Sequence, residues 1–252
     1  MSKVNVGKIT IGEGMPKICV PIVGETADEI VAEAEYCKSL PIDLVEWRVD
    51  CCSQAFLQTW LGDTMRSLRK VLKDIPILFT FRSKKEGGKR AITEEQYLDM
   101  ISFVARAAYV DLIDIELSMG EDIVRRCVEL IHTENLPVLI SSHDFEKTPS
   151  IEEMRARLEK MQELGGEILK LAVMPQSRRD VLDLLAVTEE LSGRGDMSPL
   201  VTMAMSDLGV ITRVAGESFG SVMSFGAAKN ASAPGQLPVE ELRQVLETLK
   251  KG

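Results

Sequence analysis

The regular alternation of short apolar runs with longer amphipathic stretches constrains the fold of this chain more than any other feature. Alternating strands and helices favour a parallel sheet with right-handed crossovers, and eight such units predict a single (β/α)8 barrel. The eight runs, each of a length and composition typical of strands, are Ile18–Val23, Asp43–Val49, Ile77–Arg82, Leu112–Leu117, Val138–Ser142, Ile168–Val173, Leu200–Met205 and Val222–Phe225.

The stretches between the runs carry signals for the start of helices. Pairs typical of a capping box are Thr26 with Glu29, Thr93 with Gln96 and Ser150 with Glu153. A last helix is expected to open near Pro238, because apolar residues follow it at helical spacing. The apolar residues before the first run predict a small β-hairpin over the bottom of the barrel; they are Val4, Val6, Ile9 and Ile11.

A doubly wound open sheet is the alternative arrangement of these elements. Such a sheet usually has a glycine-rich phosphate turn after its first strand. Here that place is taken by Gly24, Glu25 and Thr26, so the closed barrel is favoured. The length of 252 residues also suits one barrel of roughly 250 residues, and we expect residues 1–252 to form a single catalytic domain.

Charge and composition exclude several classes of function. The formal net charge of −9 argues against a nucleic-acid binder, which needs a basic surface. It leaves room for a small anionic substrate, since a few arginines can dominate a cleft. The N-terminal segment lacks the apolar stretch of a signal peptide, and no apolar run approaches the roughly 18 residues of a membrane span. We therefore expect a cytoplasmic protein without a membrane partner.

The cysteines do not have the pattern of a disulfide framework. Their number is odd, no CxxC motif occurs, and the set is Cys19, Cys37, Cys51, Cys52 and Cys127. The adjacent Cys51 and Cys52 are interpreted as small side chains packed after a strand, in preference to a redox pair.

Polar residues gather at the ends of the expected strands, where the chemistry of such barrels lies. Residues two apart in a strand share a face. The outer face of a barrel strand meets helices and should be apolar, so the polar side chains must point inward. The same-face sets are Glu46 with Arg48, Thr80 with Arg82, Asp114 with Glu116, Ser141 with His143, Lys170 with Ile168 and Ala172, and Met203 with Met205.

Lys170 is the most informative of these residues, because its neighbours along the strand are apolar and a lysine is rarely buried without a partner. One interpretation pairs it with an inner carboxylate such as Glu46, Asp114 or Glu116. The other makes it a nucleophilic amine, since burial and nearby cations favour the neutral form of a lysine. The spacing alone leaves both interpretations open.

His143 follows the fifth expected strand, beside the strand of Lys170, and an imidazole suits proton transfer near neutral pH. A purely structural loop histidine is the alternative. His132, late in a helix, is interpreted as a surface residue. Because the chain has only these two histidines and no paired cysteine ligands, we expect no catalytic metal.

Taken together, the motifs resemble those of type I 3-dehydroquinate dehydratases, and the likeness extends from about Val4 to the last helix. The segments that carry it are EWRVD (46–50), FTFRSKKEGG (79–88), SSHDFEKTP (141–149), ILKLAVMPQ (168–176), VTMAMSDLG (201–209), TRVAGE (212–217) and SFGAAKNASAPGQ (224–236). The resemblance implies a (β/α)8 barrel that acts as a homodimer without cofactor or metal, on the small molecule 3-dehydroquinate.

The resemblance also implies a role for each matched residue. Lys170 corresponds to the lysine that forms a Schiff base, His143 to the general acid–base, and Glu86 to the carboxylate that orients the histidine. Arg213 corresponds to the arginine that binds the substrate carboxylate. Groups that hold the hydroxyls and order the site are Glu46, Arg48 and Arg82; the apolar wall is Met203, Met205 and Phe225; the closing loop is Ser232, Ala233 and Gln236.

Two positions depart from the pattern of the family. Pro21 stands where some members have a serine that touches the substrate, and Ser142 stands where an amide side chain commonly precedes the histidine. Two rival functions remain: a class I aldolase, which would share the lysine but usually acts on phosphorylated substrates, and a barrel that only binds or regulates. The strand-eight loop, residues 226–236, has no obvious phosphate nest, and both Lys170 and His143 are present.

Overall fold

Eight parallel strands form the centre of the protein in a computed structural model that describes residues 2–229 and 233–250. The strands pair in the order β10-β3-β4-β5-β6-β7-β8-β9. A bridge between Leu200 and Ser221 lies between the two outer strands of this order and nearly closes the ring. The strands are β3 (Lys17–Ile22), β4 (Leu44–Arg48), β5 (Ile77–Thr80), β6 (Leu112–Glu116), β7 (Val138–His143), β8 (Ile168–Val173), β9 (Leu200–Ala204) and β10 (Met223–Phe225).

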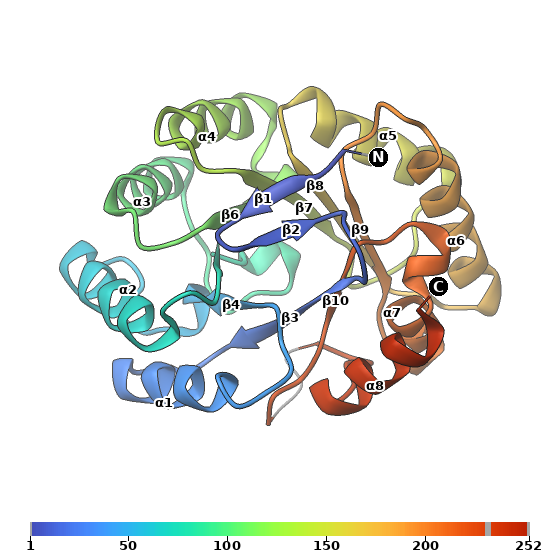
Figure 1. The fold of residues 1–252 in the computed structure, drawn as a ribbon. Helices are drawn as coiled ribbons and strands as arrows, with labels where there is room; N and C mark the ends of the chain where they lie inside the picture. Colours follow the sequence, from blue (N-terminus) through green and yellow to red (C-terminus); the bar gives the residue numbers. More distant parts are fainter. Residues whose placement is uncertain (1, 230–232, 251–252) are drawn as a thin grey trace.

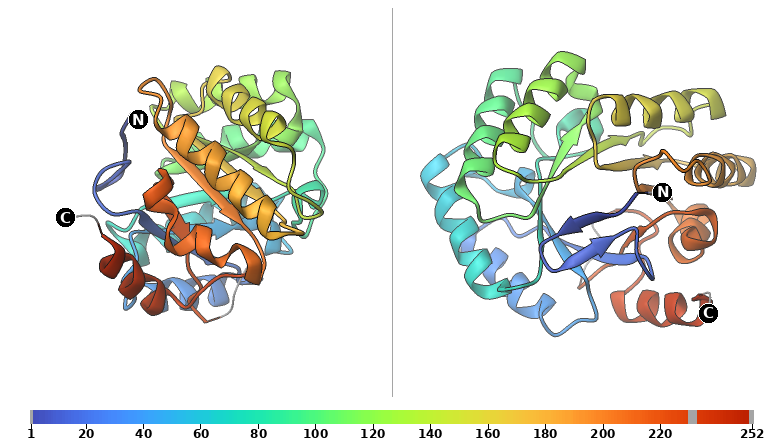
Figure 2. Two further views of the ribbon diagram at one scale, coloured as in Figure 1. Left: turned by 90° about the vertical axis from the view of Figure 1, so that its right-hand side faces the viewer. Right: turned by 45° about the horizontal axis from the view of Figure 1, so that its top comes forward.

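Helices cover the outside of this ring and alternate with its strands along the chain (Figure 1; Figure 2). The predicted (β/α)8 barrel is therefore confirmed. The helices are α1 (Ala27–Cys37), α2 (Gln58–Leu72), α3 (Glu94–Ala107), α4 (Glu121–Thr133), α5 (Ile151–Glu163), α6 (Arg178–Ser192), α7 (Val210–Val214) and α8 (Val239–Leu249). In the described part of the chain, none of them is long and apolar enough to cross a membrane.

The predicted N-terminal hairpin is present as β1 (Val4–Val6) and β2 (Ile9–Ile11), which pair antiparallel. It lies across one end of the barrel (Figure 1). Val6 and Ile11 are fully buried and belong to one apolar cluster with residues at or near the beginnings of the barrel strands. The hairpin thus closes the N-terminal end of the barrel with apolar side chains.

The start signals read from the sequence cap three helices. Thr26 and Thr93 form complete capping boxes with Glu29 and Gln96. The Ser150 side chain accepts the N–H of Glu153, which is one half of the predicted box. Each bond satisfies a backbone N–H that the first turn of a helix cannot pair internally.

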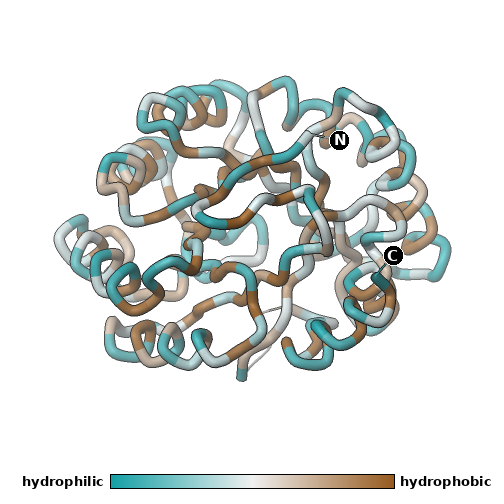
Figure 3. Tube along the Cα trace, in the orientation of Figure 1, coloured by the Kyte–Doolittle hydropathy of each residue, from teal (hydrophilic) through white to brown (hydrophobic). Residues whose placement is uncertain are grey.

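Apolar clusters lie on both faces of the strands, and the smaller one, inside the ring, is the cluster that includes Val6 and Ile11. The larger lies between the strands and the helices, where Trp47 packs edge-on against Phe79 with ring centroids 5.8 Å apart. Figure 3 shows the corresponding pattern, with hydrophobic residues along the strands and hydrophilic residues on the outer sides of the helices. The outward faces of the strands are apolar, as expected, so the polar side chains lie on the inner face.

The two adjacent cysteines lie just after β4, at the end of the 3-10 helix Val49–Cys51, and so after a strand as the sequence predicted. Cys51 and Cys52 are free thiols, Cys52 is buried and Cys51 is partly so. Burial, the largest influence on both, raises the pKa of Cys51 to about 11 and that of Cys52 to about 12. Both thiols are therefore protonated and unreactive at neutral pH.

Candidate active site

A cavity of about 350 Å³ lies at the C-terminal ends of the strands, the end of the barrel opposite the hairpin. It brings together most of the residues that the sequence singled out. Those that line it are Glu46, Arg48, Arg82, His143, Lys170, Met203, Met205, Arg213, Phe225, Ala233 and Gln236. Glu86 is absent from this lining and lies behind His143, whereas Ser232 falls outside the described residues.

Lys170 projects from β8 into this cavity and is only 4% exposed. Its Nζ lies 3.6 Å from Glu46 Oε1 and 4.0 Å from the centre of the Phe225 ring. The pairing with an inner carboxylate, one of the two interpretations left open, is thus observed. At 3.6 Å it is longer than the roughly 2.7–2.9 Å of a charge-assisted hydrogen bond. The amine is therefore held near Glu46 and remains on the cavity wall.

His143, at the end of β7, is oriented by Glu86. Glu86 Oε2 lies 2.9 Å from His143 Nδ1 and 3.1 Å from the His143 backbone N–H. Because this oxygen already accepts from the His143 backbone N–H and from Arg82 Nη1, it also acts as the acceptor toward the ring, so we assign the proton to Nδ1, which leaves the lone pair on Nε2. Burial, together with the positive charges of Arg82 and Lys170, holds the pKa of His143 well below its usual 6.5. The imidazole is neutral at pH 7 and can act as a base.

Glu86 ends a short 3-10 helix, Lys84–Glu86, in the loop after β5 and is 3% exposed. Arg82 Nη1 lies 3.3 Å from the same Oε2 atom that faces the histidine. Burial and the neighbouring Glu116 raise the pKa of Glu86 to about 8. Its ionisation is therefore sensitive to the charges around it.

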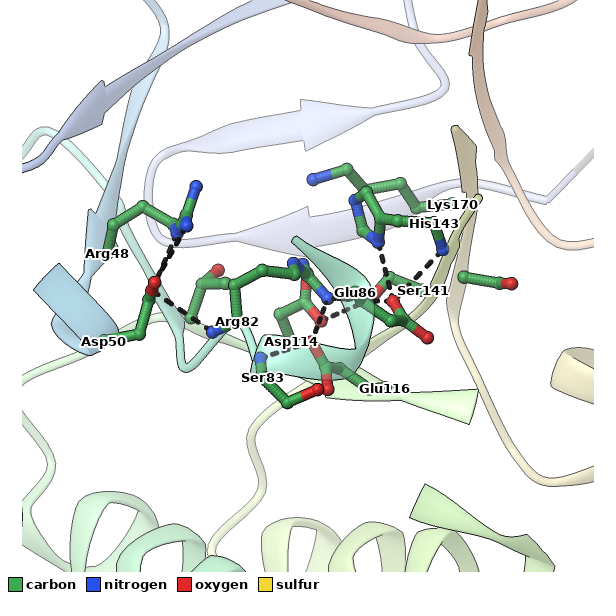
Figure 4. A network of polar contacts seen from close by, with 12 residues as sticks. Arg48, Asp50, Arg82, Ser83, Glu86, Asp114, Glu116, Ser141, His143 and Lys170 are labelled. Atoms are coloured by element: carbon green, nitrogen blue, oxygen red, sulfur yellow. Dashed lines mark hydrogen bonds and ion pairs between the residues drawn. The ribbon is translucent and has the colours of Figure 1, made fainter. Parts of the chain in front are cut away.

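Arg82 is the centre of a buried polar network below the cavity (Figure 4). Its Nη2 donates to Asp114 at 2.7 Å and its Nη1 to Glu116 at 2.8 Å. Ser141 accepts from Nη1 at 3.0 Å and donates to Asp114 at 2.6 Å. Burial opposes the charge of Arg82, but the two carboxylates raise its pKa well above the ordinary value. Most donors of this guanidinium are used inside the protein, which suits a group that orders the site.

Arg48 has a bidentate partner that the sequence reasoning did not identify. Its Nε and Nη2 donate to the two oxygens of Asp50, at 2.8 and 2.9 Å. Asp50 is the last residue of the EWRVD motif (46–50), and its place in that motif was the signal that could have found it. Asp114 and Glu116, which the sequence offered as possible partners of Lys170, contact Arg82 instead, and Ser141 joins the same network.

Arg213, in the short helix α7, has a very different environment although it is only 3% exposed. Its Nη2 donates to the carbonyl of Pro234 at 3.0 Å, and its Nη1 lies 3.7 Å from Met203 Sδ. Burial lowers the pKa of Arg213 to about 10. No carboxylate in the described ranges forms an ion pair with it. A buried cation without a counter-ion on a cavity wall is suited to bind an anion.

Comparison with known proteins agrees with this geometry. The family model of type I 3-dehydroquinase matches residues 18–252. The chain belongs to the type I 3-dehydroquinase family. The 3-dehydroquinate dehydratase of Clostridium botulinum is 51% identical over 246 residues, which cover 98% of this chain and 97% of the relative. That of Listeria welshimeri is 48% identical over 251 residues, covering 100% and 99%.

A solved structure of the same family has the same fold. The type I 3-dehydroquinate dehydratase of Clostridium difficile, described with covalently modified comenic acid, superposes with a TM-score of 0.95. It is 46% identical, and the match covers 98% of each chain.

The two departures from the family pattern lie beside the cavity and do not line it. Pro21 is paired in register with Glu46 and borders a separate small pocket near α1. Ser142 is 7% exposed and accepts a long bond of 3.4 Å from Arg157. In the described ranges no group of three or more His, Cys, Asp or Glu side chains is arranged to hold a metal ion. That this type I 3-dehydroquinase needs no metal or cofactor stays a prediction.

Proposed function

We propose that this protein is a hydro-lyase that converts 3-dehydroquinate to 3-dehydroshikimate through an imine on Lys170, within the shikimate pathway to aromatic amino acids. The observation that carries the proposal is the convergence of a buried amine, a neutral imidazole and an uncompensated guanidinium on one cavity. Membership of the family and identities near 50% to named 3-dehydroquinate dehydratases support the same activity.

In the first step the neutral Lys170 amine adds to the C3 ketone, and loss of water gives an iminium ion. A proton must leave the ammonium before attack, and the Glu46 carboxylate, 3.6 Å from Nζ, is placed to accept it. The centre of the Phe225 ring lies 4.0 Å from Nζ, so the ring can stabilise the resulting cation through a cation–π contact. Support for covalent chemistry in this family comes from the C. difficile structure with covalently modified comenic acid.

In the second step His143 Nε2 removes a proton from C2, whose acidity is raised by the adjacent iminium ion. Glu86 keeps the ring in the required orientation through the 2.9 Å contact to Nδ1. The imidazolium then gives the proton to the departing C1 hydroxyl, so one group serves as base and acid. Water finally hydrolyses the imine and releases the product and Lys170.

The remaining cavity residues hold the substrate. Arg213 would bind the carboxylate, for which a planar guanidinium is better suited than an ammonium. Glu46, Arg48 and Arg82 would hold the hydroxyls and order the site. The other proposed contacts are Met203, Met205 and Phe225 in the wall and Ser232, Ala233 and Gln236 in the loop after β10.

Borohydride reduction in the presence of 3-dehydroquinate, followed by peptide mass mapping, tests the proposal directly. We expect one ligand-sized adduct on Lys170, formed together with product that absorbs as a conjugated enone. Lys170→Ala should lose both adduct and turnover, whereas Lys160→Ala, on the outer helix α5, should keep both. Turnover of a sugar phosphate without dehydroquinate activity would favour an aldolase, and binding without product would favour a non-enzymatic barrel.

We also propose that residues 1–252 act as one catalytic domain, in a homodimer and in the cytoplasm, as the family resemblance implies. Light scattering on the purified protein should give about twice the 27.9 kDa of one chain. A mass of one chain at micromolar concentration would contradict the dimer.

A further inference from the structure

Asp50 has an unusual number of partners for a residue outside the proposed catalytic set. It follows β4 within the 3-10 helix Val49–Cys51 and is fully buried. Its Oδ1 accepts from Arg48 Nε at 2.8 Å and from the Arg82 backbone N–H at 3.2 Å. Its Oδ2 accepts from Arg48 Nη2 at 2.9 Å and from the Lys89 backbone N–H at 3.1 Å. Figure 4 shows Asp50 between Arg48 and Arg82.

The two residues whose backbone N–H groups donate to Asp50 lie on either side of Glu86 in the sequence. Arg82 precedes the loop that carries Glu86, and Lys89 follows it. Within this loop, Gly88 N–H donates to Ser83 O at 2.9 Å and Lys84 N–H donates to Arg90 O at 2.8 Å. Asp50 therefore fixes the base of a closed loop whose middle holds the carboxylate that orients His143.

The side-chain contacts fix a second cavity group. A bidentate pair holds a guanidinium in one plane and one direction. Because Asp50 takes Nε and Nη2 of Arg48, the Nη1 atom lies outside the pair. Arg48 lines the cavity, so the two N–H groups of Nη1 and the second N–H of Nη2 are the donors outside this pair.

Asp50 is charged in this setting. Burial opposes its ionisation, but the Arg48 guanidinium and the backbone N–H groups hold its pKa below the ordinary value. Four N–H donors converge on the two oxygens, two on each. An asparagine would have to turn its amide NH2 toward two of these donors in either orientation.

We propose that Asp50 is a positioning residue for the dehydration, a single carboxylate that sets both the direction of Arg48 in the cavity and the place of the Glu86 loop. The proposal rests on the proposed function, because it assigns tasks to Arg48 and Glu86 in that reaction. Asp50 itself contacts no reacting atom. Its two effects should separate: Arg48 acts on substrate binding, and the Glu86 loop acts on proton transfer by His143.

The test compares Asp50→Asn with Asp43→Asn in the full-length protein. Asp43 stands just before the same strand, at its other end, and likewise accepts from a backbone N–H and an arginine: Ile18 N at 2.7 Å and Arg243 Nη2 at 2.6 Å. We expect Asp50→Asn to raise KM about tenfold and to lower kcat about tenfold, in line with the losses that small displacements of catalytic groups cause. Asp43→Asn should lower the melting temperature but leave KM and kcat of the folded protein within about twofold.

The same substitution in an Arg48→Ala background separates the two effects. We expect Asp50→Asn to leave KM unchanged there, because Arg48 is already absent, and still to lower kcat. Normal kcat and KM in folded Asp50→Asn, or an undiminished rise of KM in the double variant, would overturn the proposal. If Asp50→Asn does not fold, Asp50→Glu takes its place with the same expected directions, and wild-type constants would again refute it. Product formation and adduct trapping by the wild type test the dehydratase activity separately.

Discussion

At the scale of single residues, three arginines of one cavity differ in their partners, and this difference separates their tasks. Arg82 is surrounded by carboxylates and Arg48 has one bidentate carboxylate, whereas Arg213 donates to a carbonyl and has no acidic partner within the described residues. A buried guanidinium without a counter-ion carries an uncompensated desolvation free energy, which destabilises the fold. A bound carboxylate would remove this cost, so Arg213 is the arginine most suited to the acidic end of the substrate.

Replacing Arg213 should therefore affect binding more than chemistry. We expect Arg213→Ala to weaken binding by roughly 2–5 kcal/mol, because it leaves a desolvated carboxylate unpaired. Arg213→Lys should lose less binding free energy than Arg213→Ala, since lysine keeps the positive charge although it cannot form the bidentate contact. Steady-state KM and kcat of both variants measure this. A loss confined to kcat, with KM unchanged, would contradict carboxylate binding at Arg213.

The pH dependence of the reaction should reflect the environment of His143. Burial and the positive charges of Arg82 and Lys170 hold its pKa well below 6.5, so the basic form persists as pH falls below that value. Because kcat/KM reports the pKa values of the free enzyme, we expect the acid limb that belongs to this base to lie below pH 6.5. Measuring kcat/KM from pH 5 to 9 checks it. A half-maximal point at or above 6.5 on the acid side would be inconsistent with a neutral, buried imidazole.

The sequence allowed the cavity residues on strands to be predicted better than those on loops. Lys170 stands out because a strand repeats every two residues, so a polar residue among apolar ones marks the inner face. Glu86 has no such pattern, and only the family resemblance pointed to it. Asp50 was missed because it follows the strand, where a 3-10 helix replaces the period of two.

At the scale of elements, local signals predicted the strands and helix starts within one or two residues. The differences have physical causes. The run Ile77–Arg82 was expected to be strand throughout, but β5 ends at Thr80, and the Arg82 N–H donates to Asp50 and not to a neighbouring strand. The run to Met205 also stops early, at Ala204, and the chain then turns at Ser206, which has a φ of 61°. A side-chain partner distant in the sequence follows the end of β5, and a left-handed backbone turn follows the end of β9; no local pattern contains either.

The loop after β5 should tolerate no side chain at Gly88. A Cβ there would lie 1.8 Å from the Arg82 carbonyl oxygen, a backbone atom that cannot move aside. We expect Gly88→Ala to displace the loop, separate Glu86 from His143 and lower kcat by tenfold or more, in keeping with the cost of misplacing catalytic groups. Gly195→Ala is the matched control, because a Cβ there meets nothing within 4 Å. Equal activity of the two variants would show that the loop adjusts without consequence.

At the scale of the whole molecule, the active site depends on closure of the barrel. The Arg82 network joins side chains 27 to 59 residues apart in the sequence. Periodicity places each of them on an inner face but cannot say which strand faces which. The closed ring also crowds carboxylates: Glu86, Asp114 and Glu116 all contact one arginine. Burial first, and then the neighbouring Glu116 and Asp114, raise the pKa of Glu86, which implies a stability cost for the whole fold.

That cost should appear as a pH-dependent gain in stability when Glu86 is neutralised. The ordinary pKa of Glu86 is 4.5 and the folded value is about 8. Between these values the folded protein keeps a proton that the unfolded chain releases. The contribution of this group therefore falls as pH rises from 4.5 to 8, and the penalty is complete above 8.

Glu86→Gln removes the ionisation and keeps an oxygen that can accept from His143. We expect its free energy of unfolding to match that of the wild type near pH 5 and to exceed it near pH 8.5 by on the order of 1–3 kcal/mol, while kcat falls; denaturant unfolding at both pH values measures this. Glu189→Gln, on the exposed side of α6, should show no such change with pH. A variant no more stable than the wild type at pH 8.5 would mean that the buried acidic cluster does not strain the fold, and that evolution has not exchanged stability for catalysis at this position.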